Sequence, residues 1–341
     1  MKRIVGSLLI ATLGLATLTA CDPPYPPELV ETIYEQNPVC EPGVVSVKAL
    51  GRSEQLVSTF NDTMIGLCPD MSIELNNSDP ALTIQYEQPE GINGVFAATP
   101  LFVDAGVAVT TFSSGVTLNL SLPVLFKILS GEITNWNAPE IVKLNKKIEQ
   151  IDLPIVVNPV ADGKSLEALT NWAKLTKVQI PSKLLTTPES NPNIDLLNVQ
   201  EGTLSLLPLS VVLNQGFSPS SIQAGTLVAP SDTSVFAGAS QFKATPKGSS
   251  VQLVQDLALE PEIAKGAEKA DTPYQAVFFG WQVLTGEDNL TTRAVGRFLL
   301  RMDEQGTLPG ASLIGLPSKI RQVSTNLVSK GLKLPKVTIK K

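Results

Sequence analysis

Segments typical of strands alternate with segments typical of helices along most of this chain, and this alternation constrains the fold more than any other feature. Short apolar or β-branched stretches typical of strands occupy residues 44–50, 71–75, 92–98, 105–110 and 153–158. Apolar side chains recur with helical spacing in residues 54–65, 122–130, 166–175, 292–303 and 318–330. The alternation predicts an α/β architecture with largely parallel sheets, and a length of 341 residues suggests about two domains.

Three stretches fit this pattern less well. Residues 202–213 are apolar and fit a strand or a helix equally. Residues 181–192 and 229–246 are rich in proline, serine and threonine, so the sequence predicts loops there.

The composition excludes several classes of protein. Charged residues make up 17% of the chain and hydrophobic residues 43%, which is not the balance of a disordered protein. The net charge of -6 gives no basic excess for binding nucleic acid. Histidine is absent, so Ser-His-Asp and Cys-His catalysis are excluded and the commonest metal ligand is missing. We therefore expect no metal, no cofactor and no enzymatic activity.

The first twenty residues are typical of an export signal. Lys2 and Arg3 precede an apolar run that is short for a membrane span. The end of the run, Leu18–Cys21, resembles a bacterial lipobox, in which cleavage precedes the cysteine and lipid is attached to it. The alternative is an ordinary secretory peptide followed by a chance cysteine. We expect residues 1–20 to be the signal peptide and residues 21–43 to be a lipid anchor on Cys21 with a proline-rich tether.

This anchor would hold the protein at the extracytoplasmic face of a bacterial cell membrane. The other two cysteines, Cys40 and Cys68, form an even pair in an exported chain, and this predicts a disulfide. Two buried free thiols are the alternative. Two cysteines without histidine make a poor metal site.

One stretch is distinctive enough to suggest a family. Residues 118–141 contain the segment from Gly131 to Pro139, read as Gly-Glu-Ile-Thr-Asn-Trp-Asn-Ala-Pro. This segment resembles the periplasmic phosphate-binding proteins, the solute receptors of phosphate ABC transporters, and the order of the other segments agrees over most of residues 44–331. Trp136 lies within the structural part of that motif, so we expect it, like Trp172, in the core rather than as a platform for a sugar.

The resemblance implies a two-lobed, periplasmic-binding-protein-like (type II) α/β fold with a cleft between the lobes. The expected first lobe comprises residues 44–103 and 275–341, and the expected second lobe comprises residues 104–274. The family holds phosphate without a metal, through backbone N–H groups and hydroxyls at helix N-termini, an arginine and an acceptor aspartate.

This sequence departs from the family at those positions. Thr99 stands where the family has its aspartate, and Val160 stands where it has its arginine. Lys164 is the cation nearest to that arginine, but a lysine lacks the bidentate fork of a guanidinium. The resemblance makes these residues the candidates for ligand binding: Arg52, Ser53, Thr99, Asp162, Gly163, Lys164 and Ser165. The alternative is that they are solvated turn residues and helix caps.

Two functions follow from this pattern. The first is a surface-anchored receptor that binds a small anion or another small solute in the cleft and delivers it to an ABC transporter permease. The second is a scaffold or regulatory protein that kept the receptor fold without a ligand, because fold alone does not determine function.

Overall fold

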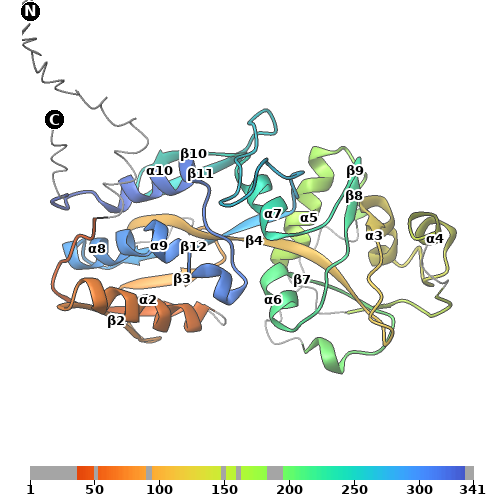
Figure 1. The fold of residues 1–341 in the computed structure, drawn as a ribbon, viewed down its shortest axis with the longest axis horizontal. Helices are drawn as coiled ribbons and strands as arrows, with labels where there is room; N and C mark the ends of the chain where they lie inside the picture. Colours follow the sequence, from red (N-terminus) through yellow and green to blue (C-terminus); the bar gives the residue numbers. More distant parts are fainter. Residues whose placement is uncertain are drawn as a thin grey trace, which may run out of the picture.

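The structure, a computed structural model, describes residues 37–49, 53–89, 94–146, 151–158, 163–182 and 195–334. Figure 1 shows two lobes side by side, each containing strands and helices, with the long strand β4 (Val95–Thr111) running through both. The expected α/β architecture is confirmed, but the sheets are mixed rather than largely parallel, because the longest ladders are antiparallel. The proposed signal peptide and Cys21 lie outside the described residues. Within the described residues, no helix combines the length and the hydropathy that a bilayer crossing requires.

The first lobe is built on a mixed sheet whose strands run in the order β10-β11-β4-β12-β3-β1-β2. The bounds of its strands other than β4 are β1 Gly43–Ala49, β2 Met71–Leu75, β3 Leu82–Gln85, β10 Phe242–Lys247, β11 Ser250–Gln255 and β12 Val277–Thr285. Its helices are α2 Ser53–Leu67, α8 Leu290–Phe298, α9 Met302–Gln305 and α10 Ser318–Val328, with a 3-10 turn, η3, at Leu308–Ala311. Helix α2 packs on β1 and β2, and α10 packs on β4 and β10.

The second lobe has shorter strands and a larger share of helix. Its strands are β5 Leu120–Ser121, β6 Val156–Val157, β7 Thr203–Pro208, β8 Ile222–Ala224 and β9 Thr226–Val228. Its helices are α3 Leu122–Ser130, α4 Pro139–Leu144, α5 Gly163–Leu175, α6 Leu209–Asn214 and α7 Asp232–Ala239, with a 3-10 turn, η2, at Leu196–Asn198. Strand β7 pairs with the far half of β4, and α5 packs on the same strand.

Strand β4 joins the lobes because its two halves have different partners. Residues 95–105 pair antiparallel with β12 in the first lobe, and residues 106–111 pair with β7 in the second. The sequence predicts two strands here, at 92–98 and 105–110, but the structure has one. Pro100 falls where the β12 register shifts between Gly280 and Trp281, and this irregularity allows the strand to continue past a residue without an N–H.

The segment expected to be a loop at 229–246 is instead helix α7 followed by strand β10. Ser231 caps α7 by accepting from the Ser234 backbone N–H, and the Ser234 side chain accepts in turn from the Ser231 N–H. The serines that suggested a loop thus form a capping box. The hairpin β10–β11, within the range expected for the second lobe, is paired with β4 in the sheet of the first.

Each lobe is stabilised by a feature that the sequence analysis identified. Cys40 and Cys68, the expected pair, are joined by a disulfide that ties the start of β1 to the end of α2. In the second lobe Trp136 is 1% exposed, and its Nε1 donates to the Gly202 carbonyl at 2.9 Å. Gly202 has a φ of +78°, and a Cβ there would lie 2.9 Å from the Pro154 carbonyl oxygen. Trp136 therefore belongs to the core, as does the buried Trp172.

Candidate functional site

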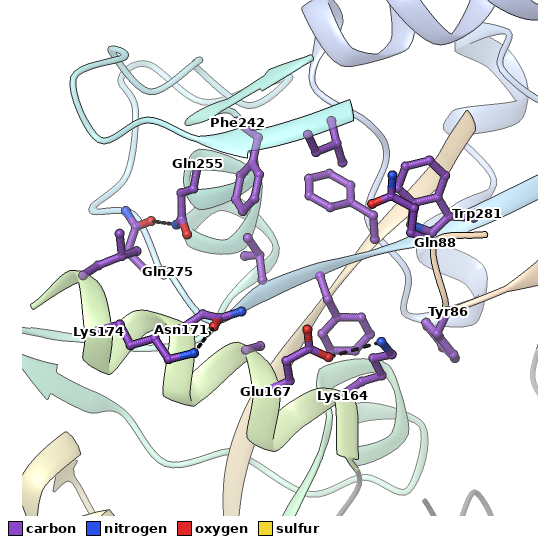
Figure 2. A pocket seen from close by; sticks show the side chains of 16 residues that line it. Tyr86, Gln88, Lys164, Glu167, Asn171, Lys174, Phe242, Gln255, Gln275 and Trp281 are labelled. Carbon is purple, nitrogen blue, oxygen red and sulfur yellow. Dashed lines mark hydrogen bonds and ion pairs between the residues drawn. The ribbon is translucent and has the colours of Figure 1, made fainter. Parts of the chain in front are cut away.

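A cavity of about 430 Å³ has two facing walls (Figure 2). One face of helix α5 forms the second-lobe wall. The first-lobe wall consists of β10, β11, β12 and the segment after β3. The lining of the cavity includes Tyr86, Lys164, Glu167, Asn171, Lys174, Phe242, Gln255, Gln275, Phe278 and Phe279.

The second-lobe wall carries charged and amide groups because their positions share one helical face. Lys164, Glu167, Asn171 and Lys174 follow one another at intervals of three or four residues along α5. Lys164 Nζ lies 3.2 Å from Glu167 Oε2, and Lys174 Nζ donates to Asn171 Oδ1 at 3.2 Å. Figure 2 shows both pairs on the cavity side of the helix. Each lysine is thus held by a neighbour one turn away.

A glycine in β4 allows α5 to lie close to the crossing strand. A Cβ on Gly106 would be 2.5 Å from the Ser165 carbonyl oxygen, so a larger residue would push the helix away. The Gly106 carbonyl also accepts from the buried Tyr274 hydroxyl at 2.9 Å, and burial raises the pKa of Tyr274. The ring of Tyr274 packs edge-on against Trp172 of α5. The position of the second-lobe wall is therefore fixed from its buried side.

Aromatic rings dominate the first-lobe wall. Phe242 of β10 packs edge-on against Phe279 of β12, with ring centroids 5.1 Å apart and planes at 77°. Tyr86 packs in the same way against Phe278, at 5.4 Å and 72°. Edge-to-face pairs of this kind stabilise each other beyond their buried area. They give this wall a rigid apolar surface.

Beside Phe242, three glutamines form a chain of hydrogen bonds, and two of them, Gln255 and Gln275, line the cavity (Figure 2). Gln255 Nε2 donates to Gln275 Oε1 at 2.6 Å, and Gln275 Nε2 donates to Gln241 Oε1 at 2.5 Å. Gln241 Nε2 donates in turn to the carbonyls of Leu257 and Leu259, at 3.3 and 2.8 Å. Backbone carbonyls only accept, so they fix the direction of the whole chain of amides.

A buried carboxylate joins the lobes next to this cavity. Asp104 lies in β4 and is 1% exposed. It accepts from the backbone N–H and the hydroxyl of Ser210, at the start of α6, at 3.2 and 2.6 Å. The Tyr86 hydroxyl approaches the same carboxylate at 3.5 Å. Asp104 thus connects an aromatic residue of the first-lobe wall with a helix of the second lobe.

The structure separates the candidate residues that the sequence had grouped. Lys164 lines the cavity, whereas Gly163 and Ser165 are buried at the start of α5. Thr99 is 0% exposed, and its hydroxyl accepts from Gln282 Nε2 at 3.0 Å inside the first lobe. Ser53 begins α2 but its side chain is outside the described part, as are Arg52 and Asp162. Thr99 and Lys164 therefore do not meet at one point.

Sequence reasoning did not select the aromatic and amide wall. Phe242 falls in the segment expected to be a loop, and the three glutamines have no motif in common. The available signal was the density of aromatic residues at Phe278, Phe279 and Trp281. Within the described ranges there is no group of three or more acidic, cysteine or histidine residues that could hold a metal ion.

Comparison with known proteins gives structural neighbours only. No family model matches the chain, and no curated protein matches it. A chain described as a phosphate ABC transporter substrate-binding protein from Clostridium perfringens, with bound phosphate, superposes with a TM-score of 0.51 at 16% identity, covering 81% of this chain and 100% of that one.

Two further neighbours have the same fold. The high-affinity periplasmic phosphate-binding protein PfluDING, bound with phosphate, gives a TM-score of 0.52 at 11% identity, with 86% of this chain and 99% of that chain covered. An ancestral soluble variant of the human phosphate-binding protein gives 0.52 at 12% identity, with coverages of 82% and 92%. These similarities establish the fold of phosphate-binding receptors, which is the fold that the sequence resemblance implied.

Proposed function

We propose that this chain is an extracytoplasmic solute receptor that binds a small solute in the cavity between its lobes and serves an ABC transporter permease. The observation that carries the proposal is the cavity itself, because both lobes supply polar side chains to one space of about 430 Å³. Cavities of this size at a junction between lobes are typical of small-molecule sites. A solute that contacts both walls would favour the closed arrangement of the lobes.

Phosphate is a weak candidate for this solute. Thr99, at the family's aspartate position, is buried and already hydrogen-bonded. Lys164 is paired with Glu167, so the positive charge nearest to the expected arginine position is offset by a carboxylate on the same wall. An oxyanion in a poorly solvated site needs an unopposed cation or several donors.

A blocked cavity tests the receptor function before the solute is known. Asn171 is exposed on α5 and lines the cavity, so Asn171→Trp would fill the space without disturbing the core. Lys319→Trp, on the exposed part of α10, adds the same side chain away from the cavity. We expect a culture extract to leave at least one small molecule bound to the wild type and to Lys319→Trp, but not to Asn171→Trp.

The readout is mass spectrometry of the small molecules that remain with each protein after desalting and are released on denaturation. The chain used lacks residues 1–21. If all three proteins retain the same molecules, or none, the receptor proposal is contradicted. That result would favour the alternative function, a scaffold or regulatory protein without a ligand. Titration of phosphate, with sulfate as the control, decides the phosphate question separately.

The membrane anchor is part of the same proposal and rests on the sequence of residues 1–21. The full chain should partition with membranes and incorporate labelled palmitate when produced in a bacterial host. Cys21→Ser should abolish the labelling and release the protein. Labelling that survives this substitution would contradict an anchor at Cys21.

A further inference from the structure

We propose that the solute is a neutral polyhydroxylated molecule, of the size of a mono- or disaccharide, rather than an oxyanion. This inference rests on the proposed receptor function and names the ligand class of the same cavity. Three independent features of the walls point to it: the free end of the glutamine chain, the aromatic rings, and the pairing of the charges on α5.

The glutamine chain ends in a hydrogen-bond acceptor. Both N–H groups of Gln241 are taken by backbone carbonyls, which orders Gln275 and then Gln255 in the same direction. Gln255 donates one N–H of its Nε2 to Gln275, and no described residue hydrogen-bonds the other N–H of this amide or its Oε1. Figure 2 shows Gln255 at the edge of the cavity. The wall therefore presents an acceptor next to a donor, a pair that is satisfied by hydroxyl groups, which both donate and accept.

A phosphate or sulfate ion suits this acceptor poorly. Sulfate carries no proton at neutral pH, and phosphate carries one or two, whereas a sugar has a donor on nearly every carbon. A single oxyanion would also occupy only a small part of a cavity of about 430 Å³. Cavities of roughly 300–1,000 Å³ are typical of larger organic ligands.

The aromatic rings supply the apolar surface that a sugar needs. Phe242 projects from β10 into the cavity in Figure 2, and its edge-on contact with Phe279 fixes its position. The C–H face of a sugar ring packs well on a rigid aromatic side chain. An inorganic anion gains nothing from such a surface, since it would lose water there without a partner.

The charged side chains of α5 are arranged as paired hydrogen-bonding groups rather than as a cluster of cations that would bind an anion. The ion pair of Lys164 and Glu167 offers both donors and acceptors, a combination that matches adjacent hydroxyls. Lys174 donates to Asn171 and lies at the exposed part of the helix, where water screens its charge. The wall is thus neutral at the Lys164–Glu167 pair and carries a single positive charge, that of Lys174, at its water-exposed end.

The test is a titration series with defined probes, followed by calorimetry and tryptophan fluorescence, since Trp281 lines the cavity. The neutral probes are glucose, maltose, trehalose, sucrose and myo-inositol. Phosphate, sulfate and citrate are the anions, and glutamine and glutamate are the amino acids. We expect at least one neutral probe to bind with a Kd below about 100 μM, and none of the anions to do so.

Two variants on one strand then assign the binding to the acceptor. Gln255→Met removes Oε1, together with the Nε2 that donates to Gln275, while nearly keeping the volume, and should weaken binding of that probe about 3- to 10-fold. Gln252→Met is the matched control, because Gln252 is exposed on β11 and does not line the cavity. Phe242→Leu should weaken binding further, and Asn171→Trp, at an exposed position that tolerates change, should abolish it.

The outcomes separate this inference from the receptor function. If an anion or an amino acid binds, and Asn171→Trp abolishes that binding, the receptor stands and the polyhydroxylated ligand is overturned. If every probe fails while the culture-extract experiment retains an ionic molecule, the ligand class is again overturned. If the probes fail and the extract experiment also shows no cavity-dependent molecule, both proposals fall. Equal weakening by Gln255→Met and Gln252→Met would overturn the role of the glutamine chain.

Discussion

The two lobes bury different kinds of side chain. In the first lobe, Arg293, Arg297, Arg301, Arg321 and Glu304 are all nearly inaccessible to water. In the described part of the second lobe, the buried polar groups are hydroxyls and amides, and the buried carboxylate of Asp104 lies in β4 where this strand crosses between the lobes. Burying a charge costs free energy unless it is paired, whereas a hydroxyl or an amide needs only hydrogen bonds. The stability of the first lobe should therefore depend on pH, and that of the second on packing.

Arg293 shows how the first lobe stabilises a buried charge by pairing it. It is 3% exposed, and both oxygens of Asp288 accept from its guanidinium. Its Nη1 also donates to the carbonyls of Leu327 and Val328 at the end of α10. The guanidinium lowers the pKa of the Asp288 carboxyl, since it favours the charged form. One buried cation thus joins α8 to α10.

The largest effect is expected from Trp136→Ala in the second lobe. The ring is buried, packs edge-on against Phe112 with centroids 5.4 Å apart, and donates to Gly202. Its removal should lower the free energy of unfolding by about 4 kcal/mol. Urea unfolding measures the loss, and hydrogen exchange should rise in residues 120–158 but not in β1, β2 or α2. Equal increases in both lobes would show that the lobes unfold as one unit.

The disulfide offers the corresponding test in the first lobe. Cys40→Ser opens a loop of 28 residues and should lower the free energy of unfolding by about 3 kcal/mol. Cys40 is the exposed partner, so the substitution leaves the buried Cys68 in place. Hydrogen exchange should now rise in α2 and β1 and stay constant around Trp136. Reduction of the wild type by dithiothreitol must reproduce the change, and a variant that melts like the wild type would contradict the prediction.

A smaller, pH-dependent effect is expected from Glu304. Its side chain is 0% exposed and neither carboxyl oxygen has a hydrogen-bond partner. Burial, together with the nearby Asp303, raises the pKa of Glu304 to about 7, against the opposing effect of Arg301. The folded state therefore prefers the protonated acid, and its stability falls as pH rises from about 4.5 to about 7, by up to roughly 3 kcal/mol.

Glu304→Gln isolates this contribution because glutamine cannot ionise. The difference in unfolding free energy between Glu304→Gln and the wild type should grow in favour of the variant across that pH interval. Asp303→Asn is a second variant for the same measurement, because it removes the neighbouring carboxylate that raises the pKa of Glu304. Arg301 holds the pKa of Asp303 itself below its ordinary value. A difference that is constant with pH would contradict the assignment. Hydrogen exchange of the second lobe should not respond to pH in this way.

The smallest effect is expected from an exposed ion pair in the second lobe. Lys127 Nζ lies 3.4 Å from Glu140 Oε1, and both side chains are nearly half exposed. The pKa of Glu140 is lowered by its own backbone N–H and by Lys127. Glu140→Gln should leave the urea midpoint within experimental error, because water screens exposed pairs. A clear loss would show that charge also matters to this lobe.

Local sequence was sufficient for elements whose signals lie within a few residues of one another. Helix α3 begins after Ser121, whose hydroxyl accepts from the Val124 N–H, and ends at Gly131 with a φ of 81°. The helix predicted at 122–130 from its apolar spacing has these same bounds in the structure, Leu122–Ser130. The end of the helix predicted at 292–303 was less accurate, because α8 stops at Phe298 and Arg301 is extended. Only the packing of the first lobe decides where that helix stops.

The sequence by itself determined the α/β class, the paired cysteines and the segment around Trp136, whereas the export signal at residues 1–20 stays a prediction. These features rest on periodicity, on composition and on residues close together in the chain. The tertiary structure decided the cavity. Gln241, Gln255 and Gln275 form one chain of hydrogen bonds because the β10–β11 hairpin and the crossing to β12 bring them together. Thr99, by contrast, was expected at the site but lies in the core. Pairing of β4 with β12 places its hydroxyl against Gln282. Contacts between distant segments depend on the pairing of strands and lobes, and a single sequence does not display that pairing.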